Sequence, residues 1–217
     1  MKNLLKKELK LTASPLSFCF IAFGLMALIP NYPILVGAFF VSFGIFHTFQ
    51  SARENSDILY SALLPVKKSD VVKSKFIFCV FIELCGFIVM LLASLIRMTL
   101  LKDAVPYANG ALMNANFVFL GFALAVFAAF NLIFVRGFFK TGYYFAKPFI
   151  LFIVVAFLII GVAETLHHIP PFAALNSAGF ENLPLQLIIL LCGAIIYIFI
   201  TLLSLKLSEK SFSRIDL

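Results

Sequence analysis

Long apolar runs constrain this chain more than any other feature of its sequence. We place them at about residues 14–30, 33–50, 76–96, 113–135, 148–166 and 185–205. Each run approaches the roughly 20 residues that an α-helix needs to cross the hydrocarbon of a bilayer. Of the 217 residues, 63% are hydrophobic and only 12% are charged, which excludes a soluble domain of this length. The sequence therefore predicts an all-α integral membrane protein, with six transmembrane helices in one domain over residues 1–217.

The basic residues are divided unevenly between the two sides that these spans define. Fifteen of the 17 Lys and Arg residues lie near the chain ends or in the connections after the second and fourth spans, whereas Arg97 and Lys102 lie on the other side. Because Lys and Arg are retained in the cytoplasm, we expect a multi-pass chain in the cell membrane with both termini cytoplasmic. The same retention explains the net charge of +7, so we expect no nucleic-acid partner.

Residues 1–12, MKNLLKKELKLT, combine leucines with lysines. This composition predicts an interfacial helix that lies in the membrane surface, with lysines such as Lys6 and Lys7 toward anionic headgroups. A signal peptide is the alternative, since a basic stretch precedes an apolar run. No A-x-A-like cleavage site follows, and five more apolar runs come after, which favours the interfacial helix.

The longest polar stretch on the cytoplasmic side covers residues 53–75 and reads RENSDILYSALLPVKKSDVVKSK. Residues 57–64 have a helical pattern of apolar side chains, and Pro65 ends that helix because the residue before a proline is pushed out of the α region. A second helix is predicted to begin at Ser69 and Asp70, which suit an N-cap and an acidic first turn. The stretch thus predicts a short amphipathic helix, a proline break and a basic elbow. The alternative is a solvated loop that carries a cluster of cations.

Several polar residues lie at membrane depth. By depth alone, His47, Glu83 and Asn131 share the cytoplasmic third of the bilayer, and Arg97 lies near the outer end of the third span. An ionisable group is costly in hydrocarbon, so we expect Glu83 to face the protein interior and to find partners there. A packing contact between helices is the interpretation that we favour for these residues. A substrate or gating site is the alternative.

No motif in the chain indicates catalysis. Gly137 and Gly142 have the spacing of a phosphate loop, but Tyr143 stands where that loop requires a lysine. The stretch from Glu164 to His168 contains metal-ligating residue types in an order that matches no zinc motif. The four cysteines lie inside apolar runs and form no C-x-x-C pair. We therefore expect no enzymatic activity, no metal and no cofactor.

The connection between the fifth and sixth spans, HHIPPFAALNSAGFENLPL, contains three prolines around an apolar middle at residues 172–175. This pattern suits a short helix that dips back toward the membrane within residues 169–184, followed by a turn at residues 177–179. Such backbone is tolerated at membrane depth only against protein or a cavity. A plain exterior loop is the alternative.

The whole chain resembles the permease subunits of bacterial ABC-2-type ABC transporters. The resemblance is carried by MKNLLKKELKL, by the six-span layout, and above all by ENSDILYSALLPVKKSDVVKSKF. In that family, a similar acidic segment followed by Leu-Pro and a basic segment forms the coupling helix that docks on the ATPase subunit. The family's re-entrant segment between spans five and six would match Ile169–Pro184. Small members of the family include exporters of bacteriocins, antibiotics and amphipathic peptides such as phenol-soluble modulins.

The resemblance implies the permease subunit of an ATP-driven exporter, with cytoplasmic ABC ATPase subunits and a second permease copy or a related chain as partners. Lys67 and Lys68 would lie beside anionic headgroups. The residues expected at the ATPase interface are Glu54, Asp57, Ile58, Leu59, Tyr60, Leu63 and Leu64. Two alternatives remain: a six-span secondary transporter that uses Glu83 as an ion-coupled site, and a non-transport membrane protein such as an assembly or immunity factor.

Overall fold

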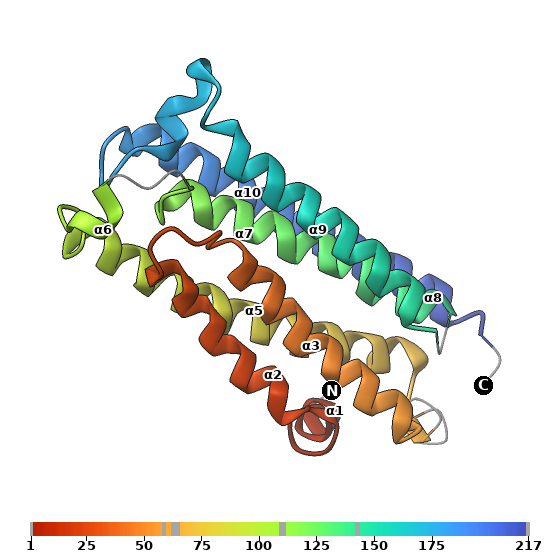
Figure 1. The fold of residues 1–217 in the computed structure, drawn as a ribbon. Helices are drawn as coiled ribbons and strands as arrows, with labels where there is room; N and C mark the ends of the chain where they lie inside the picture. The colour runs from red at the N-terminus through yellow and green to blue at the C-terminus, as the bar shows by residue number, and fades with distance from the viewer. Residues whose placement is uncertain (1, 58–59, 62–65, 109–111, 142–143, 216–217) are drawn as a thin grey trace.

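The computed structural model describes residues 2–57, 60–61, 66–108, 112–141 and 144–215. Within these ranges every regular element is a helix. Figure 1 shows the long helices running side by side along one axis, with helix α1 and the C-terminus toward the same end of the molecule. The all-α prediction is therefore confirmed.

The N-terminal half contributes α1 (Lys2–Lys7), the π-helical turn η1 (Glu8–Thr12), α2 (Pro15–Cys19), the 3-10 helix η2 (Phe20–Leu28), α3 (Val36–Glu54) and α5 (Lys68–Thr99). Ser14 caps α2, because its hydroxyl accepts a hydrogen bond from the Leu16 amide at 3.3 Å. After η2 the chain reverses at Asn31, which has a left-handed φ of 53°. This turn places η2 beside α3, in agreement with the predicted tight turn.

The C-terminal half contributes α6 (Val105–Ala108), α7 (Phe117–Ala129), the π-helical segment η3 (Phe130–Val135), α8 (Arg136–Thr141), α9 (Ala146–Leu166), the 3-10 helix η4 (Pro170–Asn176) and α10 (Leu183–Phe212). Asn116 caps α7, because its Oδ1 accepts from the amides of Val118 and Phe119 at 3.0 and 3.1 Å. The short helix η4 lies in the segment predicted to contain one. Its dip toward the membrane stays a prediction.

Small residues and phenylalanines pack the helices together. A Cβ built on Gly193 of α10 would lie 2.6 Å from the carbonyl oxygen of Gly121 in α7, so only glycine permits this approach. On the other side of the bundle, Phe46 of α3 stacks on Phe149 of α9 with ring centroids 3.8 Å apart. The first contact joins α7 to α10, and the second joins α3 to α9.

Four helical segments of the described chain are long and apolar enough to cross a membrane: Lys68–Thr99, Phe117–Thr141, Ala146–Leu166 and Leu183–Phe212. A fifth is counted if the bent pair Leu4–Lys10 and Pro15–Leu28 forms one span. The helix α3 is not among them, because its last turns carry His47, Gln50, Arg53 and Glu54. The structure thus supports four to five candidate spans and does not confirm the predicted six.

Candidate coupling face and intramembrane polar cluster

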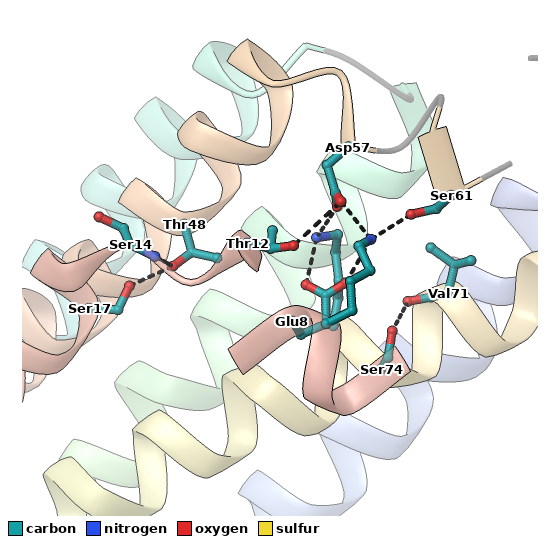
Figure 2. A network of polar contacts seen from close by, with 11 residues as sticks. Glu8, Thr12, Ser14, Ser17, Thr48, Asp57, Ser61, Val71 and Ser74 are labelled. Atoms are coloured by element: carbon teal, nitrogen blue, oxygen red, sulfur yellow. Dashed lines mark hydrogen bonds and ion pairs between the residues drawn. The ribbon is translucent and has the colours of Figure 1, made fainter. Parts of the chain in front are cut away.

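Two lysines and two carboxylates form a buried ion-pair network at the end of the molecule that holds α1. The Nζ of Lys75, in α5, lies 2.9 Å from Oε2 of Glu8 and 3.0 Å from Oδ2 of Asp57. The Nζ of Lys7 lies 2.5 Å from Oδ1 of Asp57 and 3.5 Å from Oε1 of Glu8. Figure 2 shows Glu8 and Asp57 facing this network from different segments. Because the four charges balance, each buried ion has a countercharge, without which its burial would be costly.

Hydroxyl groups extend the network on both sides. Lys7 donates to Oγ of Ser61 at 2.6 Å, and the Thr12 hydroxyl donates to Oδ1 of Asp57 at 3.4 Å. A second contact joins the start of α2 to α3, where the Ser14 amide donates to Oγ1 of Thr48 at 2.9 Å (Figure 2). The α1–η1 segment, the residues Asp57 and Ser61, and the start of α5 are therefore joined by direct polar contacts.

The charge state of Asp57 follows from its neighbours. Burial by itself raises the pKa of the Asp57 carboxyl, but the ammonium groups of Lys75 and Lys7 outweigh burial and hold the pKa below its ordinary value of 3.8. The carboxylate is thus ionised at neutral pH. This state keeps both lysines paired.

The expected ATPase-facing residues differ in their placement. Tyr60 is 58% exposed, and Glu54 is exposed at the end of α3. Asp57 is only 8% exposed, and its carboxylate contacts Lys7 and Lys75, which corrects the expectation that it faces a partner. The other four, Ile58, Leu59, Leu63 and Leu64, lie outside the described residues.

A recess of about 190 Å³ opens beside the exposed Tyr60 ring. It is lined by Lys7, Thr12, Ala52, Asn55, Asp57 and Tyr60. Its lining combines the polar residues Lys7, Thr12, Asn55 and Asp57 with the ring of Tyr60. We call Glu54, Tyr60 and this recess the coupling face.

Of the four lysines expected at the lipid headgroups, two are exposed and two are not. Lys6 and Lys67 are exposed, as a headgroup contact requires. Lys68 instead donates to the Ile215 carbonyl at 2.6 Å, and Lys7 belongs to the ion-pair network. The expectation of a headgroup contact is therefore corrected for Lys7 and Lys68, whose charges are directed into the protein.

A second polar cluster lies where α5, η3 and α10 pack against one another. Asn131 donates through Nδ2 to Oε2 of Glu83 at 3.0 Å and to Oγ1 of Thr201 at 3.1 Å. The Tyr197 hydroxyl donates to the same Glu83 oxygen at 2.6 Å. Glu83 is 1% exposed, which agrees with the expectation that it faces the protein interior. Asn131 belongs to a π-helical segment, a distortion that is frequent at functional sites.

The structure does not bring the other intramembrane residues to this cluster. His47 packs against the rings of Phe43 and Phe20, with centroids 4.7 and 6.0 Å away. Arg97 donates to the Ala27 carbonyl at 3.0 Å, and its guanidinium lies 4.7 Å from the centroid of the Tyr107 ring. Arg97 is thus held within the protein by these two contacts.

At the other end of the bundle, the polar groups join connections to helix ends. Glu164 accepts a hydrogen bond from the Met113 amide at 2.8 Å, and the Asn114 amide donates to Oδ1 of Asn176 at 2.6 Å. In the part of the chain that the structure describes, no three His, Cys, Asp or Glu side chains gather as a metal site would require.

Sequence reasoning missed several partners in both clusters. Glu8 is the single acidic residue among the N-terminal lysines, and this position could have indicated that it pairs with a lysine. Lys75 and Glu83 are eight residues apart on one helix face, which links the network to the cluster. Tyr197 and Thr201 are polar residues one turn apart in an apolar helix, and that spacing was the signal for the partners of Glu83.

Comparison with known proteins identifies the family. Searches of the curated proteins and of the solved structures found no match to the chain. The family described as ABC-2 family transporter protein matches residues 3–213. The matched region contains the ion-pair network, the coupling face and the cluster around Glu83. This chain, whose helices and composition are those of a multi-pass membrane protein, therefore belongs to the ABC-2 family of transporter proteins.

Proposed function

We propose that this chain is the permease subunit of an ATP-driven exporter and that it forms the translocation pathway. Its energy comes from separate cytoplasmic ATPase subunits. The observation that carries the proposal is the family match, which covers residues 3–213. The match favours transport driven by ATP over transport driven by an ion gradient, the alternative considered for Glu83.

We propose six crossings in place of the four to five candidate spans. Lys7 contacts Ser61, and Lys68 contacts Ile215, so the N-terminal helix, the stretch before α5 and the C-terminal end share one end of the molecule. A chain whose termini share one side must cross an even number of times. The α2–η2 segment and α3 supply the two additional crossings, and the excess of Lys and Arg makes their shared side cytoplasmic.

The coupling face is the proposed docking point for the ATPase. Glu54 and Tyr60 are exposed there, and Tyr60 adjoins the recess. Aromatic side chains that fill a partner's pocket, or border one of their own, contribute strongly to protein interfaces. The network behind this face joins Asp57 to Lys75 of α5. A displacement of the coupling face therefore reaches α5, the helix that also carries Glu83.

Two permease chains complete the proposed transporter. Six helices are few for an alternating-access pathway, so a second copy of the chain or a related chain would supply the other half. Large apolar side chains on α9 and α10 are exposed in the single chain, for example Leu158, Leu191 and Phe199. In a membrane, lipid or a second permease chain covers such side chains.

Co-purification tests the coupling proposal. The variant that combines Tyr60→Ala with Glu54→Lys removes the exposed ring and reverses the exposed charge. We expect it to insert in the membrane and to lose ATPase subunits and transport, by at least about tenfold if the ring contributes as an interface anchor does. Tyr144→Ala is the matched control, because Tyr144 is 72% exposed in the connection before α9.

Leu59→Asp with Leu63→Asp tests the predicted helix in the same assay. If both double variants retain the ATPase subunits and export, the coupling proposal is wrong. Export that continues without any ATPase subunit and follows an ion gradient would favour the secondary transporter.

A further inference from the structure

The carboxyl group of Glu83 is bonded asymmetrically. Both of its hydrogen-bond donors, Asn131 Nδ2 and the Tyr197 hydroxyl, point to the same oxygen, Oε2. Its other oxygen, Oε1, is buried and has no hydrogen-bond partner among the described residues. This asymmetry fits a neutral acid, in which Oε2 is the carbonyl oxygen that accepts both bonds and Oε1 carries the proton.

No cation compensates this carboxyl group within the described residues. Lys, Arg and His side chains in this part of the chain lie beyond ion-pair distance of Glu83, whereas Glu8 and Asp57 each have lysine partners. An uncompensated carboxylate in a low-dielectric interior costs several kcal/mol. Taking up a proton removes that cost, so burial favours the neutral acid.

The surroundings of Glu83 provide few titratable groups. On α5 itself, Cys79 lies one turn away and Lys75 two turns away, where Lys75 is paired with Glu8 and Asp57. From α10 the facing titratable group is Tyr197, which donates to Glu83.

The remaining packed elements add little charge. The sequences of η2, α7 and η3 contain no titratable side chain, and those of α1 and η1 contribute the charges of the ion-pair network. His47 of α3 packs among phenylalanine rings. Nothing among these groups replaces the proton as the partner of the Glu83 carboxyl.

A row of buried hydroxyl groups runs along α10 from this cluster toward the end that holds α1. It consists of Tyr197, Thr201, Ser204 and Ser208, whose spacing of three to four residues places them on one helix face. The hydroxyls of Ser204 and Ser208 make no hydrogen bond within the described chain. Each hydroxyl can therefore still accept and donate a hydrogen bond, the contact through which a proton passes between such groups.

A groove of about 330 Å³ between α5 and α10 lies beside the row. Thr201, which accepts from Asn131, lines this groove together with Lys73, near the beginning of α5. Its other lining residues are apolar: Phe76, Ile77, Val80, Leu202 and Leu205. The groove therefore brings Thr201 near the surface between α5 and α10, while the hydroxyl row supplies the polar groups.

We propose that Glu83 is a proton-binding site, protonated in this conformation, and that the hydroxyl row of α10 is its route to the end of the molecule that holds α1. Loss of the proton would leave an uncompensated charge between α5 and α10. Proton release therefore accompanies separation of these two helices. This inference rests on the geometry around Glu83 and does not depend on the proposed coupling to an ATPase.

Infrared spectroscopy of the purified full chain in lipid tests the protonation. We expect the wild type at neutral pH to show the carbonyl stretch of a protonated carboxylic acid, and Glu83→Gln to lack that band. Tyr197→Phe removes one hydrogen bond from Oε2 and should shift the band to higher frequency. This second variant keeps the assignment testable if Glu83→Gln does not fold. A wild-type spectrum without the band at neutral pH, or a band that neither variant changes, would overturn the proposal.

Hydrogen–deuterium exchange of the same band tests the route. We expect Ser204→Ala with Ser208→Ala to slow the deuterium shift of the Glu83 band several-fold while its intensity stays unchanged. Ser94→Ala is the matched control, because Ser94 is equally buried, also lacks a hydrogen-bond partner in the described chain, and lies on the other side of Glu83 along α5. Equal exchange rates in both variants would exclude the hydroxyl row as the route.

Discussion

Substitution of Lys75 tests the ion-pair network most directly. Lys75→Met keeps the length and apolar character of the side chain but removes one of the two cations that face Glu8 and Asp57. The Lys75 side chain is 3% exposed and that of Glu8 is 1% exposed, so solvent cannot replace the lost charge. The variant leaves two carboxylates with only Lys7 between them.

The size of the effect follows from this geometry. Removing one partner of a buried ion pair generally costs about 3–5 kcal/mol. Lys7 remains 2.5 Å from Asp57 and 3.5 Å from Glu8, so it compensates part of the loss. We therefore expect Lys75→Met to lower the free energy of unfolding by about 3 kcal/mol, the lower end of that range.

The same helix provides a matched control. Lys73, two residues away, pairs with Glu209 at 3.4 Å with its side chain 42% exposed. Such a surface pair contributes at most about 1 kcal/mol, so Lys73→Met should cost far less than Lys75→Met. Combining Lys75→Met with Glu8→Gln restores neutrality, because Lys7 and Asp57 remain as a pair. The double variant should therefore lose less stability than the sum of the single variants.

Unfolding by sodium dodecyl sulfate in mixed micelles, followed by circular dichroism, measures these differences. Equal losses for Lys75→Met and Lys73→Met would refute the argument, because they would mean that the buried lysine is effectively solvated. A double variant with strictly additive losses would show that Glu8 and Lys75 do not interact.

Three further predictions concern packing, pH and topology. Gly193→Ala should cost about 1–3 kcal/mol in the same unfolding assay, because its Cβ would lie 2.6 Å from a backbone carbonyl of α7, whereas Gly161→Ala, with no atom within 4 Å, should be neutral or slightly stabilising. The folded-state pKa of Asp57 lies below its ordinary value of 3.8, so its carboxylate stabilises the fold above that pH and the stabilisation is lost as the pH falls through the folded pKa. The stability difference between the wild type and Asp57→Asn should therefore shrink in acid, and a constant difference would contradict the assignment. Single cysteines near Lys67 and near Asn176, in a chain without other cysteines, should be labelled by an impermeant maleimide from opposite sides of the membrane; labelling of both from outside would exclude the proposed topology.

Much of the fold could be predicted because hydropathy, proline and capping residues act locally. The apolar runs predicted the long helices. The predicted N-cap at Ser69 is wrong, because α5 begins at Lys68 and its N-cap residue, Lys67, makes no capping side-chain hydrogen bond, although Asp70 does lie in the first turn. The number of spans was harder to predict for a physical reason. The helix α3 combines an apolar first half with a polar end at His47 and Arg53, so local hydropathy does not decide whether it crosses the bilayer.

The candidate sites could be predicted only in part, because their partners are distant in sequence. The cost of burying a carboxylate predicts that Glu83 has partners, but only the packing of α10 against α5 identifies Tyr197. Lys75 was counted among the basic residues of a membrane surface. It is buried because the chain folds Glu8 and Asp57 against it, and no local pattern encodes that approach.

The two polar clusters differ in the way they compensate buried charge, and that difference bears on how the permease operates. In the ion-pair network, the carboxylates of Glu8 and Asp57 face Lys7 and Lys75, so a displacement of the coupling face that separated them would expose or unpair charges. Around Glu83, neutral donors take the place of cations, so separation of α5 from α10 costs only hydrogen bonds as long as the proton remains. Lys75 and Glu83 lie on the same face of α5. We therefore expect the end of α5 that carries Lys75 to move together with the coupling face. The contacts around Glu83, which are made by neutral groups, should separate first.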